Sequence, residues 1–331
     1  MKPQSTNENS YSGSGLRSGY GLARLLAGTV LVAAATLPAA AQNASWLTSP
    51  GSGDFNTATN WTPATVPTGT AFFGFSNTTA LSFSANTTIS GWTFNAGASA
   101  YSFTNGQTLN FTGAGIAVNG GCASITNNFV LQFSNASTAG NAHITNSGGL
   151  TFFNTSTAGS AAITNNSGGV VDFSPSTGPN NDGKLSAGSI AGAGSYYLGA
   201  RQLTFAGNNL STTVSGAISD CGPTGTQCAA AGATGGALVK IGTGTLTLNG
   251  VDTYTGGTTD NAGTLAGTGT LGNTLINSGA TFAPGSGAAG TFMTINGSLA
   301  FASGAVYLVQ INPAAASLAN ATTATLTGGN V

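Results

Sequence analysis

Charge is what this sequence lacks most. Lysine and arginine contribute six of the 331 residues, aspartate and glutamate seven, and histidine one, so charged residues make up 4% of the chain. Ordinary globular proteins carry roughly 25%. The sequence therefore has no basic patch for a nucleic acid or an anionic membrane surface, and it offers few groups for acid–base catalysis. Helix formers such as Glu, Lys and Gln are also scarce, which argues against a helical bundle.

Small and β-branched residues take the place of the charged ones. The chain contains 52 glycines, and 40% of its residues are hydrophobic, which is too high a share for a disordered polar tract. A chain with few helix formers must satisfy its backbone groups in sheets. Thr, Val, Ile, Tyr and Phe favour a pleated surface, and Gly and Asn supply corners that need a positive φ. We therefore predict an all-β protein.

A stretch in the middle of the chain nearly copies itself with a 19-residue period. Residues 124–127 (SITN) return as 143–146 (HITN) and again as 162–165 (AITN). Residues 133–140 (FSNASTAG) return as 152–159 (FFNTSTAG). A fixed period of this length indicates one supersecondary unit that is stacked on copies of itself.

Apolar residues alternate with polar ones inside these units, which predicts parallel strands whose inward side chains stack from coil to coil at ~4.8 Å. Each buried aliphatic or aromatic side chain would contribute ~1.5–3 kcal/mol. Asn127, Asn146 and Asn165 recur at one phase and predict a ladder of asparagines along a turn. We expect about 14 coils in all. The predicted core stack consists of Ile125, Ile144, Ile163, Phe133 and Phe152.

The N-terminus has the organisation of an export signal. Three basic residues, the last of them Arg24, precede an apolar run at 25–37 and a small-residue site that ends at Ala41. We predict a signal peptide at 1–41 that is cleaved before Gln42. The run is shorter than the ~20 residues of a comfortable membrane span, although an uncleaved anchor is the alternative. The mature chain would keep three basic residues and six aspartates, a net charge of −3.

Residues 42–70 read as an irregular segment with Trp46 and Trp61. A stacked column needs a cap over the open end of its core, and two Trp side chains suit such a lid. We predict an N-terminal cap here. The alternative is an aromatic platform that binds sugars.

Three cysteines follow further along the chain. Cys221 and Cys228 close a short loop rich in Gly and Pro, and in an exported chain such a pair predicts a disulfide. A metal-binding pair is the alternative, but no His or further Cys lies near. Cys122 is left over, and we expect it to be a small buried residue.

The resemblance to a known family is carried by three neighbouring segments. These are residues 236–250 (GALVKIGTGTLTLNG), 254–259 (YTGGTT) and 261–265 (NAGTL). They resemble the autotransporter-associated β-strand repeat, which occurs in passenger domains of type V secreted bacterial proteins. Residues 277–285 (NSGATFAPG) are similar to the usual continuation of these passengers.

The resemblance implies a right-handed parallel β-helix, or β-solenoid, that is exported across the inner membrane and then crosses the outer membrane through a C-terminal β-barrel. The upstream segment 71–235 would hold the coils with 19-residue repeats and the Cys-bearing loop, and 178–194 would be a longer loop or an irregular coil in it. Residues 236–331 would hold the family repeat and further coils. The sequence ends without barrel strands, so we expect a truncated passenger whose translocator is absent from this chain.

Candidate catalytic residues are few, because glycoside hydrolysis needs two carboxylates ~5–10 Å apart. Asp252 and Asp260 flank a turn, and we interpret them as ordinary turn aspartates. His143, the sole histidine, should point outward because it neighbours the inward Ile144. Residues 267–272 (GTGTLG) match a dinucleotide-binding pattern but precede a strand-like segment instead of a helix. We predict no catalytic, cofactor or metal site.

These observations favour an exported, non-enzymatic passenger that acts as a cell-surface or secreted stalk or adhesin-like module. Its partners would be the general export machinery, an outer-membrane β-barrel translocator and host or matrix surfaces, with no nucleic acid. It would stay in the periplasm if no barrel is supplied. A carbohydrate-active β-helix enzyme and an aggregating extracellular matrix protein are the alternatives.

Overall fold

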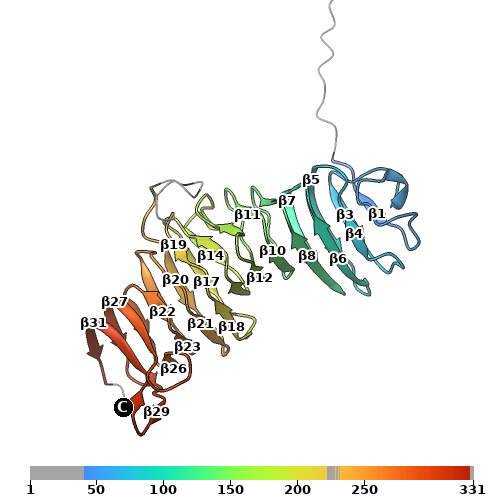
Figure 1. The fold of residues 1–331 in the computed structure, drawn as a ribbon. Coiled ribbons are helices and arrows are strands. Elements are labelled where there is room, and N and C mark those ends of the chain that lie inside the picture. The colour runs from blue at the N-terminus through green and yellow to red at the C-terminus, as the bar shows by residue number, and fades with distance from the viewer. Residues whose placement is uncertain (1–40, 222–227, 229, 231, 329–331) are drawn as a thin grey trace, which may run out of the picture. The chain divides into compact units, whose positions relative to one another are not determined.

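The fold is known from a computed structural model that describes residues 41–328 except 222–227, 229 and 231. Within this part, strands follow one another and the one helix is the short 3₁₀ turn η1 (Ala58–Asn60). The chain winds into a parallel β-helix of about 11 turns, and strands of successive turns lie side by side in Figure 1. The predicted all-β parallel β-helix is confirmed.

Three sheets run along the column, and each turn of the chain adds one strand to two or three of them. The first sheet contains β1 (Ala44–Trp46), β2 (Trp61–Thr62), β3 (Thr70–Phe73), β5 (Thr87–Phe94), β7 (Thr108–Val118), β9 (Val130–Phe133), β11 (Gly149–Phe152), β13 (Val170–Asp172), β16 (Ser195–Tyr197) and β19 (Ile218–Ser219). All of its neighbours pair in parallel except β1 and β2.

The second sheet is the longest of the three. It contains β4 (Ala80–Ser82), β6 (Ala100–Asn105), β8 (Cys122–Asn127), β10 (His143–Asn146), β12 (Ala162–Asn165), β15 (Ser189–Gly192), β18 (Thr212–Val214), β21 (Thr245–Leu248), β23 (Gly263–Gly267), β26 (Ala280–Pro284) and β28 (Val306–Tyr307). None of these strands contains a Lys, Arg, Asp or Glu residue.

The third sheet begins only in the C-terminal half. It contains β14 (Lys184–Ser186), β17 (Gln202–Phe205), β20 (Ala237–Lys240), β22 (Gly257–Asp260), β24 (Thr270–Leu271), β25 (Thr274–Ile276), β27 (Phe292–Phe301) and β31 (Leu318–Leu326). A separate hairpin consists of β29 (Ile311–Asn312) and β30 (Ala315–Ala316).

The expected number of coils is wrong. The turns number about 11 and not 14, because only the clean repeats keep the 19-residue period. Later turns are longer, as the register shows: Ile163 pairs with Ile190, and Val214 pairs with Leu248. Of the two expectations for residues 178–194, the structure confirms the irregular coil, since they contain β14 and β15.

Like residues lie over like residues in the core. Ile144 pairs in register with Ile125 on one side and with Ile163 on the other, and all three side chains are buried. Phe133 and Phe152 stack with ring centroids 5.2 Å apart. Phe111 and Phe173 extend the same row by one ring at each end, at 4.9 and 5.0 Å. The 19-residue period thus corresponds to one full turn of the chain, which places equivalent side chains in the same row.

A ladder of four asparagine amides runs parallel to these apolar rows. Asn105 donates to Asn127 at 2.7 Å, Asn127 to Asn146 at 2.7 Å, and Asn146 to Asn165 at 2.9 Å, and each amide also donates to a main-chain carbonyl. All four side chains are fully buried at the ends of their strands, not along the surface of a turn. The ladder stops where Asn165 pairs with Gly192.

We expect Asn146→Ala to destabilise the column, because it leaves the Asn127 amide and the Asn165 carbonyl without their ladder partners. Each buried polar group left unpaired costs about 1–3 kcal/mol. The measurement is the free energy of unfolding in denaturant. Thr145→Ala, an exposed change on the same strand, is the control and should stay within about 0.5 kcal/mol of the parent. Equal effects of the two changes would contradict the ladder.

The N-terminal aromatic residues are buried over the first turns. The Trp61 ring lies edge-on to those of Trp46 and Phe55, with centroids 4.9 Å away in both cases. The indole N–H of Trp46 donates to the Thr78 carbonyl at 2.9 Å, and that of Trp61 donates to the Phe55 carbonyl at 2.8 Å. Because both indoles are buried and hydrogen-bonded inward, they do not offer an exposed platform for sugars.

Candidate functional site

The two aspartates considered for carbohydrate chemistry are not turn residues at the surface. Asp260 is the last residue of β22 and is fully buried, and Asp252 is 6% exposed. They also have different partners, since Asp252 accepts from the Ile218 amide and Asp260 faces Lys240. The interpretation of ordinary turn aspartates is therefore wrong. Neither carboxylate could reach a polysaccharide without an opening of the column.

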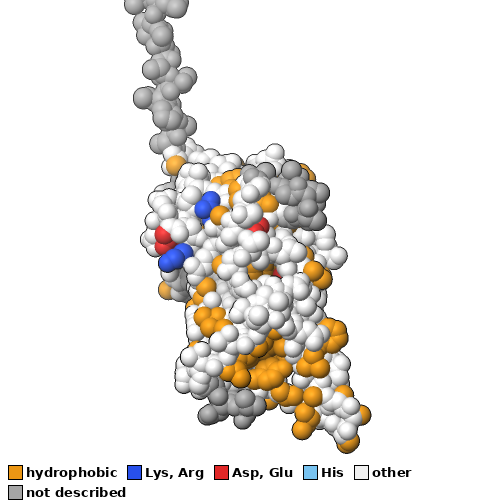
Figure 2. All heavy atoms as spheres, turned by 90° about the vertical axis from the view of Figure 1, so that its left-hand side faces the viewer, with side chains coloured by type: hydrophobic (Ala, Val, Ile, Leu, Met, Phe, Trp, Pro, Cys, Tyr) orange, Lys and Arg blue, Asp and Glu red, His pale blue; other side chains and the backbone are white. Residues whose placement is uncertain are grey.

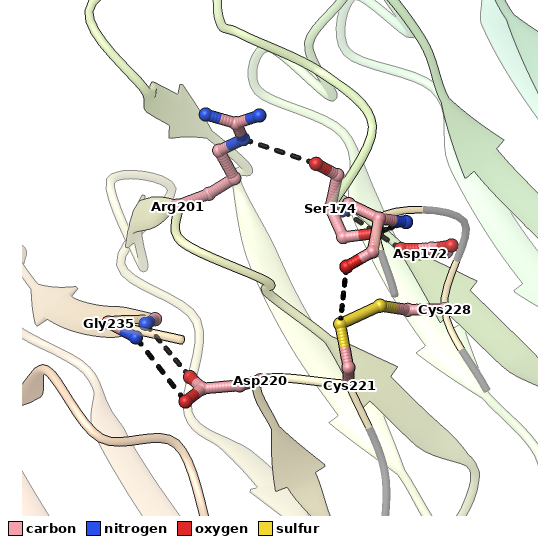
Figure 3. The surroundings of a disulfide bond; sticks show 9 residues. Asp172, Ser174, Arg201, Asp220, Cys221, Cys228 and Gly235 are labelled. Atoms are coloured by element: carbon pink, nitrogen blue, oxygen red, sulfur yellow. Dashed lines mark hydrogen bonds between the residues drawn. A yellow bond between two sulfur atoms is a disulfide. The ribbon is translucent and has the colours of Figure 1, made fainter. Parts of the chain in front are cut away.

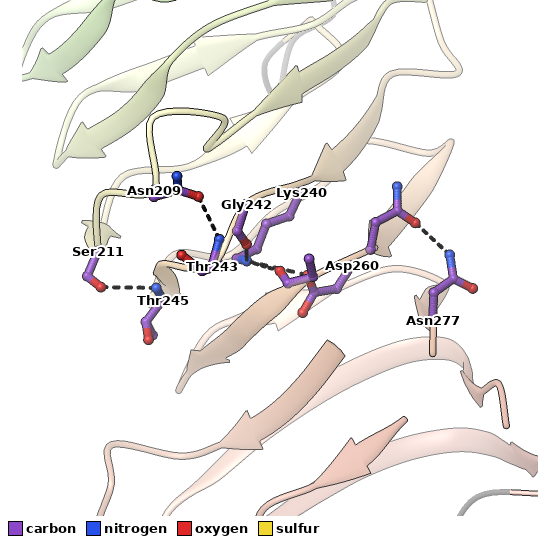
Figure 4. Close-up of polar contacts among 10 residues, drawn as sticks. Asn209, Ser211, Lys240, Gly242, Thr243, Thr245, Asp260 and Asn277 are labelled. Carbon is purple, nitrogen blue, oxygen red and sulfur yellow. Dashed lines mark hydrogen bonds and ion pairs between the residues drawn. The ribbon is translucent and has the colours of Figure 1, made fainter. Parts of the chain in front are cut away.

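Lys240 and Asp260 form a fully buried ion pair. Their residues are in register on β20 and β22, and the Lys240 Nζ lies 3.5 Å from the Asp260 Oδ1 (Figure 4). Burial lowers the pKa of Lys240 against the opposing effect of Asp260, and burial raises the pKa of Asp260 to about 6 against the effect of Lys240. The sequence did contain a signal for this pair, because Lys240 has the same parity on its strand as the inward Leu238.

Asp252 and Tyr254 form a second buried polar group. The Asp252 Oδ1 accepts from the Ile218 amide at 2.8 Å, whereas its Oδ2 has no hydrogen-bond partner among the described residues. The Tyr254 hydroxyl is hydrogen-bonded to the Thr258 hydroxyl. Burial raises the pKa of Asp252 to about 7, and burial together with the nearby Asp252 raises the pKa of Tyr254 above its ordinary value. A carboxyl of this kind is accommodated best when it is protonated.

This burial predicts that acidification stabilises the protein through Asp252. Its pKa is 3.8 ordinarily and about 7 when folded, so between these values the folded state binds the proton more tightly than the unfolded state. Stability should therefore fall as the pH rises from about 4 to 7, by up to about 4 kcal/mol from this group. We expect Asp252→Asn to flatten that part of the pH profile of the unfolding free energy. A variant profile as steep as that of the parent would contradict the assignment.

Cys221 and Cys228 form a disulfide, with Cα atoms 5.0 Å apart (Figure 3). Both cysteines are buried against Tyr197 in a small apolar cluster separate from the main core. The Cys221 Sγ lies 3.0 Å from the Ala230 carbonyl oxygen, and the Ala230 amide donates to the Ser174 hydroxyl at 3.1 Å. Cys221, Cys228 and Ala230 thus contact Tyr197 and Ser174 of the column. Of the loop between the cysteines, residues 222–227 lie outside the described part.

The Asp220 carboxylate organises the return of the chain from this loop. It accepts from the amides of Gly235 and Gly236 at 3.3 and 2.8 Å, and from the Thr255 hydroxyl at 2.8 Å (Figure 3). Arg201 lies nearby and its Nε donates to the Ser174 carbonyl at 3.2 Å. Both charged side chains thus hydrogen-bond main-chain atoms and hold the chain in place at this point.

The other residues singled out in the sequence do not converge on one place. His143 is exposed on β10, in register between Ser124 and Ala162. Residues 267–272 join the end of β23 to β24 without a helix, so the dinucleotide pattern has no helix N-terminus. Cys122 is free, and it is half-buried, not fully buried as expected.

The surface itself is nearly uncharged. Three hollows of about 320 to 370 Å³ lie along the column, and every residue that lines them is uncharged; Thr247, Asn208 and Asn273 are examples. Figure 2 shows few charged side chains on the face that it presents, and apolar side chains gather in its lower part. Within the described part, six of the eleven exposed large apolar side chains lie between residues 292 and 326.

In the part of the chain that the structure describes, no His, Cys, Asp and Glu side chains gather in a group of three or more that could bind a metal ion. The same part has no helix of the length and hydropathy needed to span a membrane. The predicted signal peptide at 1–41 lies outside the described residues, apart from Ala41.

Comparison with known proteins gives one match. Residues 238–266 match the family model of the passenger-associated-transport-repeat. No curated protein and no solved structure matches the chain. The matched segment covers β21 and β22 and most of β20 and β23, which pair with β17 and β18 on one side and with β25 and β26 on the other.

The matched repeat is therefore an integral part of the column. Passengers of this family are exported to the cell surface or the extracellular space, and in general they require an outer-membrane translocator. The repeat at 238–266 and the parallel β-helix around it together fit an autotransporter passenger repeat protein.

Proposed function

We propose that this chain is a non-enzymatic passenger that is displayed as a stalk or adhesin-like module at the cell surface or released outside the cell. The observation that carries the proposal is the passenger-associated-transport-repeat at 238–266, which is continuous with the other turns of the column. A role in display agrees with the nearly uncharged outer surface and with the burial of the Asp252 and Asp260 carboxylates.

We also propose a division of labour along the chain. Residues 1–41 would direct export, 42–70 would cap the column, 71–235 would extend it, and 236–331 would carry the transport repeat and further turns. The burial of Trp46 and the other N-terminal aromatic rings supports the capping role.

Surface display tests this proposal. Residues 42–331 are fused between a signal peptide and the translocator of a well-behaved autotransporter, and protease accessibility is measured on intact cells. We expect the parent to reach the surface and a deletion of 238–266 to lower the displayed fraction. A deletion of 143–161, which removes one clean turn of the 19-residue period, is the matched control, because it leaves the flanking turns in register. A parent that stays in the periplasm, or a control deletion as damaging as that of 238–266, would contradict the proposal.

One observation favours the aggregating matrix protein as a second candidate. The nine-residue β31 carries no charge or proline and pairs with β27 alone among the described strands. Charges and prolines are the devices with which proteins protect exposed edges. Sedimentation as a function of concentration separates the candidates: the matrix protein would form growing fibres, and a stalk would keep one constant size.

A further inference from the structure

Lys240 and Asp260 are held in register and fully buried, an arrangement more constrained than an ordinary ion pair needs. The two residues close neighbouring strands of one sheet in register, and both side chains are completely shielded from water (Figure 4). The Nζ is 3.5 Å from the Oδ1, and neither Asp260 oxygen accepts a hydrogen bond of ordinary geometry from the described residues. An amine and a carboxyl are therefore held together in a dry site.

We infer that Lys240 and Asp260 are joined by an intramolecular isopeptide bond, which forms by condensation of the two side chains after the column has folded. Fixing two reactants in contact converts a bimolecular step into an intramolecular one, with effective concentrations of about 10⁵ M or more in well-oriented cases. Exclusion of water also protects the amide product from hydrolysis. This inference does not rest on the proposed display function.

The surroundings of the Nζ direct its lone pair toward the carboxyl. The Nζ donates to the Gly242 carbonyl at 3.2 Å and also to the Ala262 carbonyl. Two of its three hydrogens are held in this way, so the hydrogen left for transfer is the one that faces Asp260. Transfer of that proton to the carboxylate gives a neutral amine and a neutral carboxylic acid, and the lone pair then faces the carboxyl group.

The reaction balances without a further reagent. The Nζ attacks the Asp260 Cγ and forms a C–N bond, one C–O bond breaks, and the departing hydroxyl takes a proton from the nitrogen and leaves as water. Burial favours the two neutral reactants, since it lowers the pKa of Lys240 and raises that of Asp260. The backbone amides of Ala262 and Leu265 lie near the carboxyl and lower its pKa, an effect smaller than the rise that burial causes. During attack, the same amides would stabilise negative charge on the carboxyl oxygen.

Gly263 leaves the space in which the amine sits. A Cβ atom at this position would come within 2.7 Å of the Lys240 Nζ, and its φ of +76° also favours glycine. The bond would tie β20 to β22, two neighbouring strands inside the transport repeat. Because these side chains meet only in the folded column, the tie would form after folding, and once formed it would also restrict the unfolded chain.

Intact-mass spectrometry of the purified, folded and reduced chain tests the inference. We expect the parent to be lighter than its sequence by one water, with Lys240 and Asp260 in one branched peptide after proteolysis. Lys240→Met and Asp260→Ala should have the full mass of their sequences. Asp260→Asn should still condense, with loss of ammonia instead of water. Lys184→Met, a change at an exposed lysine beside Asp182, is the matched control and should keep the loss of water.

The mass of the parent decides the outcome even if a variant fails to fold. A parent that is folded by circular dichroism, has its full sequence mass and releases peptides with free Lys240 and Asp260 would overturn the inference. Persistence of the water loss in Asp260→Ala would also overturn it, because the water would then come from another site.

Discussion

Phe133→Ala is expected to lower the free energy of unfolding by about 3–5 kcal/mol, the usual effect of removing a large aromatic side chain from a packed core. The Phe133 ring is fully buried and stacks at 4.9 Å on Phe111 and at 5.2 Å on Phe152. The truncation leaves a cavity in the middle of a row, and the rings on both sides lose a contact. Denaturant unfolding, followed by circular dichroism, measures the loss.

The matched control is Phe129→Ala, slightly earlier in the same turn. Its ring is 53% exposed, so the same chemical change should cost less than about 1 kcal/mol. Because turns of a repeat column interact mainly with their neighbours, hydrogen exchange should show the largest loss of protection around β7, β9 and β11. Similar losses in the two variants would mean that Phe133 does not lie in a packed row.

Lys240→Met is the second change for which we expect a large effect. It keeps the length of the side chain but leaves the Asp260 carboxylate buried and without its partner. Breaking one side of a buried pair typically costs about 3–5 kcal/mol. If the two groups are covalently joined, the variant also loses this cross-link, and the loss of stability should be larger. The measurement is again the free energy of unfolding, at a pH well above the parent Asp260 pKa of about 6, which rises further when Lys240 is removed.

Two further variants separate the buried charge from other causes. Lys184→Met removes an exposed lysine and should change the stability by less than about 0.5 kcal/mol. Addition of Asp260→Leu to Lys240→Met should recover part of the loss, because the uncompensated charge is then gone. If the double variant is no more stable than Lys240→Met, the loss of stability comes from altered packing around the lysine side chain and not from the unpaired carboxylate.

The column itself could be predicted from the sequence because its rows repeat. Ile125, Ile144 and Ile163 share one phase of the 19-residue period, and one phase of a stacked coil means one row. Asn105 belongs to the same ladder as Asn127, but 22 residues separate the two, so the period alone did not reveal it. The third sheet was not visible either, because the lengths of the later turns vary and no fixed spacing marks its strands.

The buried polar groups were harder to predict than the rows. Lys240 and Asp260 are of types that rarely lie in a core unless they are paired, and their pairing depends on which turns are neighbours. Lys240 shares the strand parity of the inward Leu238, which indicates the inner face. The hydrogen-bond partner of Asp252 is not a neighbour in the sequence, since the amide that it accepts from belongs to Ile218, 34 residues earlier. The register between turns decides which of these polar groups meet, and a single sequence does not reveal that register.

The register of the outer threonines gives the most direct test of the stacked column. Thr145 pairs with Thr126 on one neighbouring strand and with Thr164 on the other, and all three are exposed. Successive turns are ~4.8 Å apart, and alternate turns are about twice as far.

Pairs of cysteines would be introduced at these positions in a Cys122→Ser background. The folded variants would be treated with a short bifunctional thiol reagent that bridges neighbouring turns but not alternate ones. The account predicts intramolecular cross-links for 126 with 145 and for 145 with 164, and none for 126 with 164. Equal cross-linking of all three pairs, or none of the neighbouring pairs linked in folded protein, would contradict it.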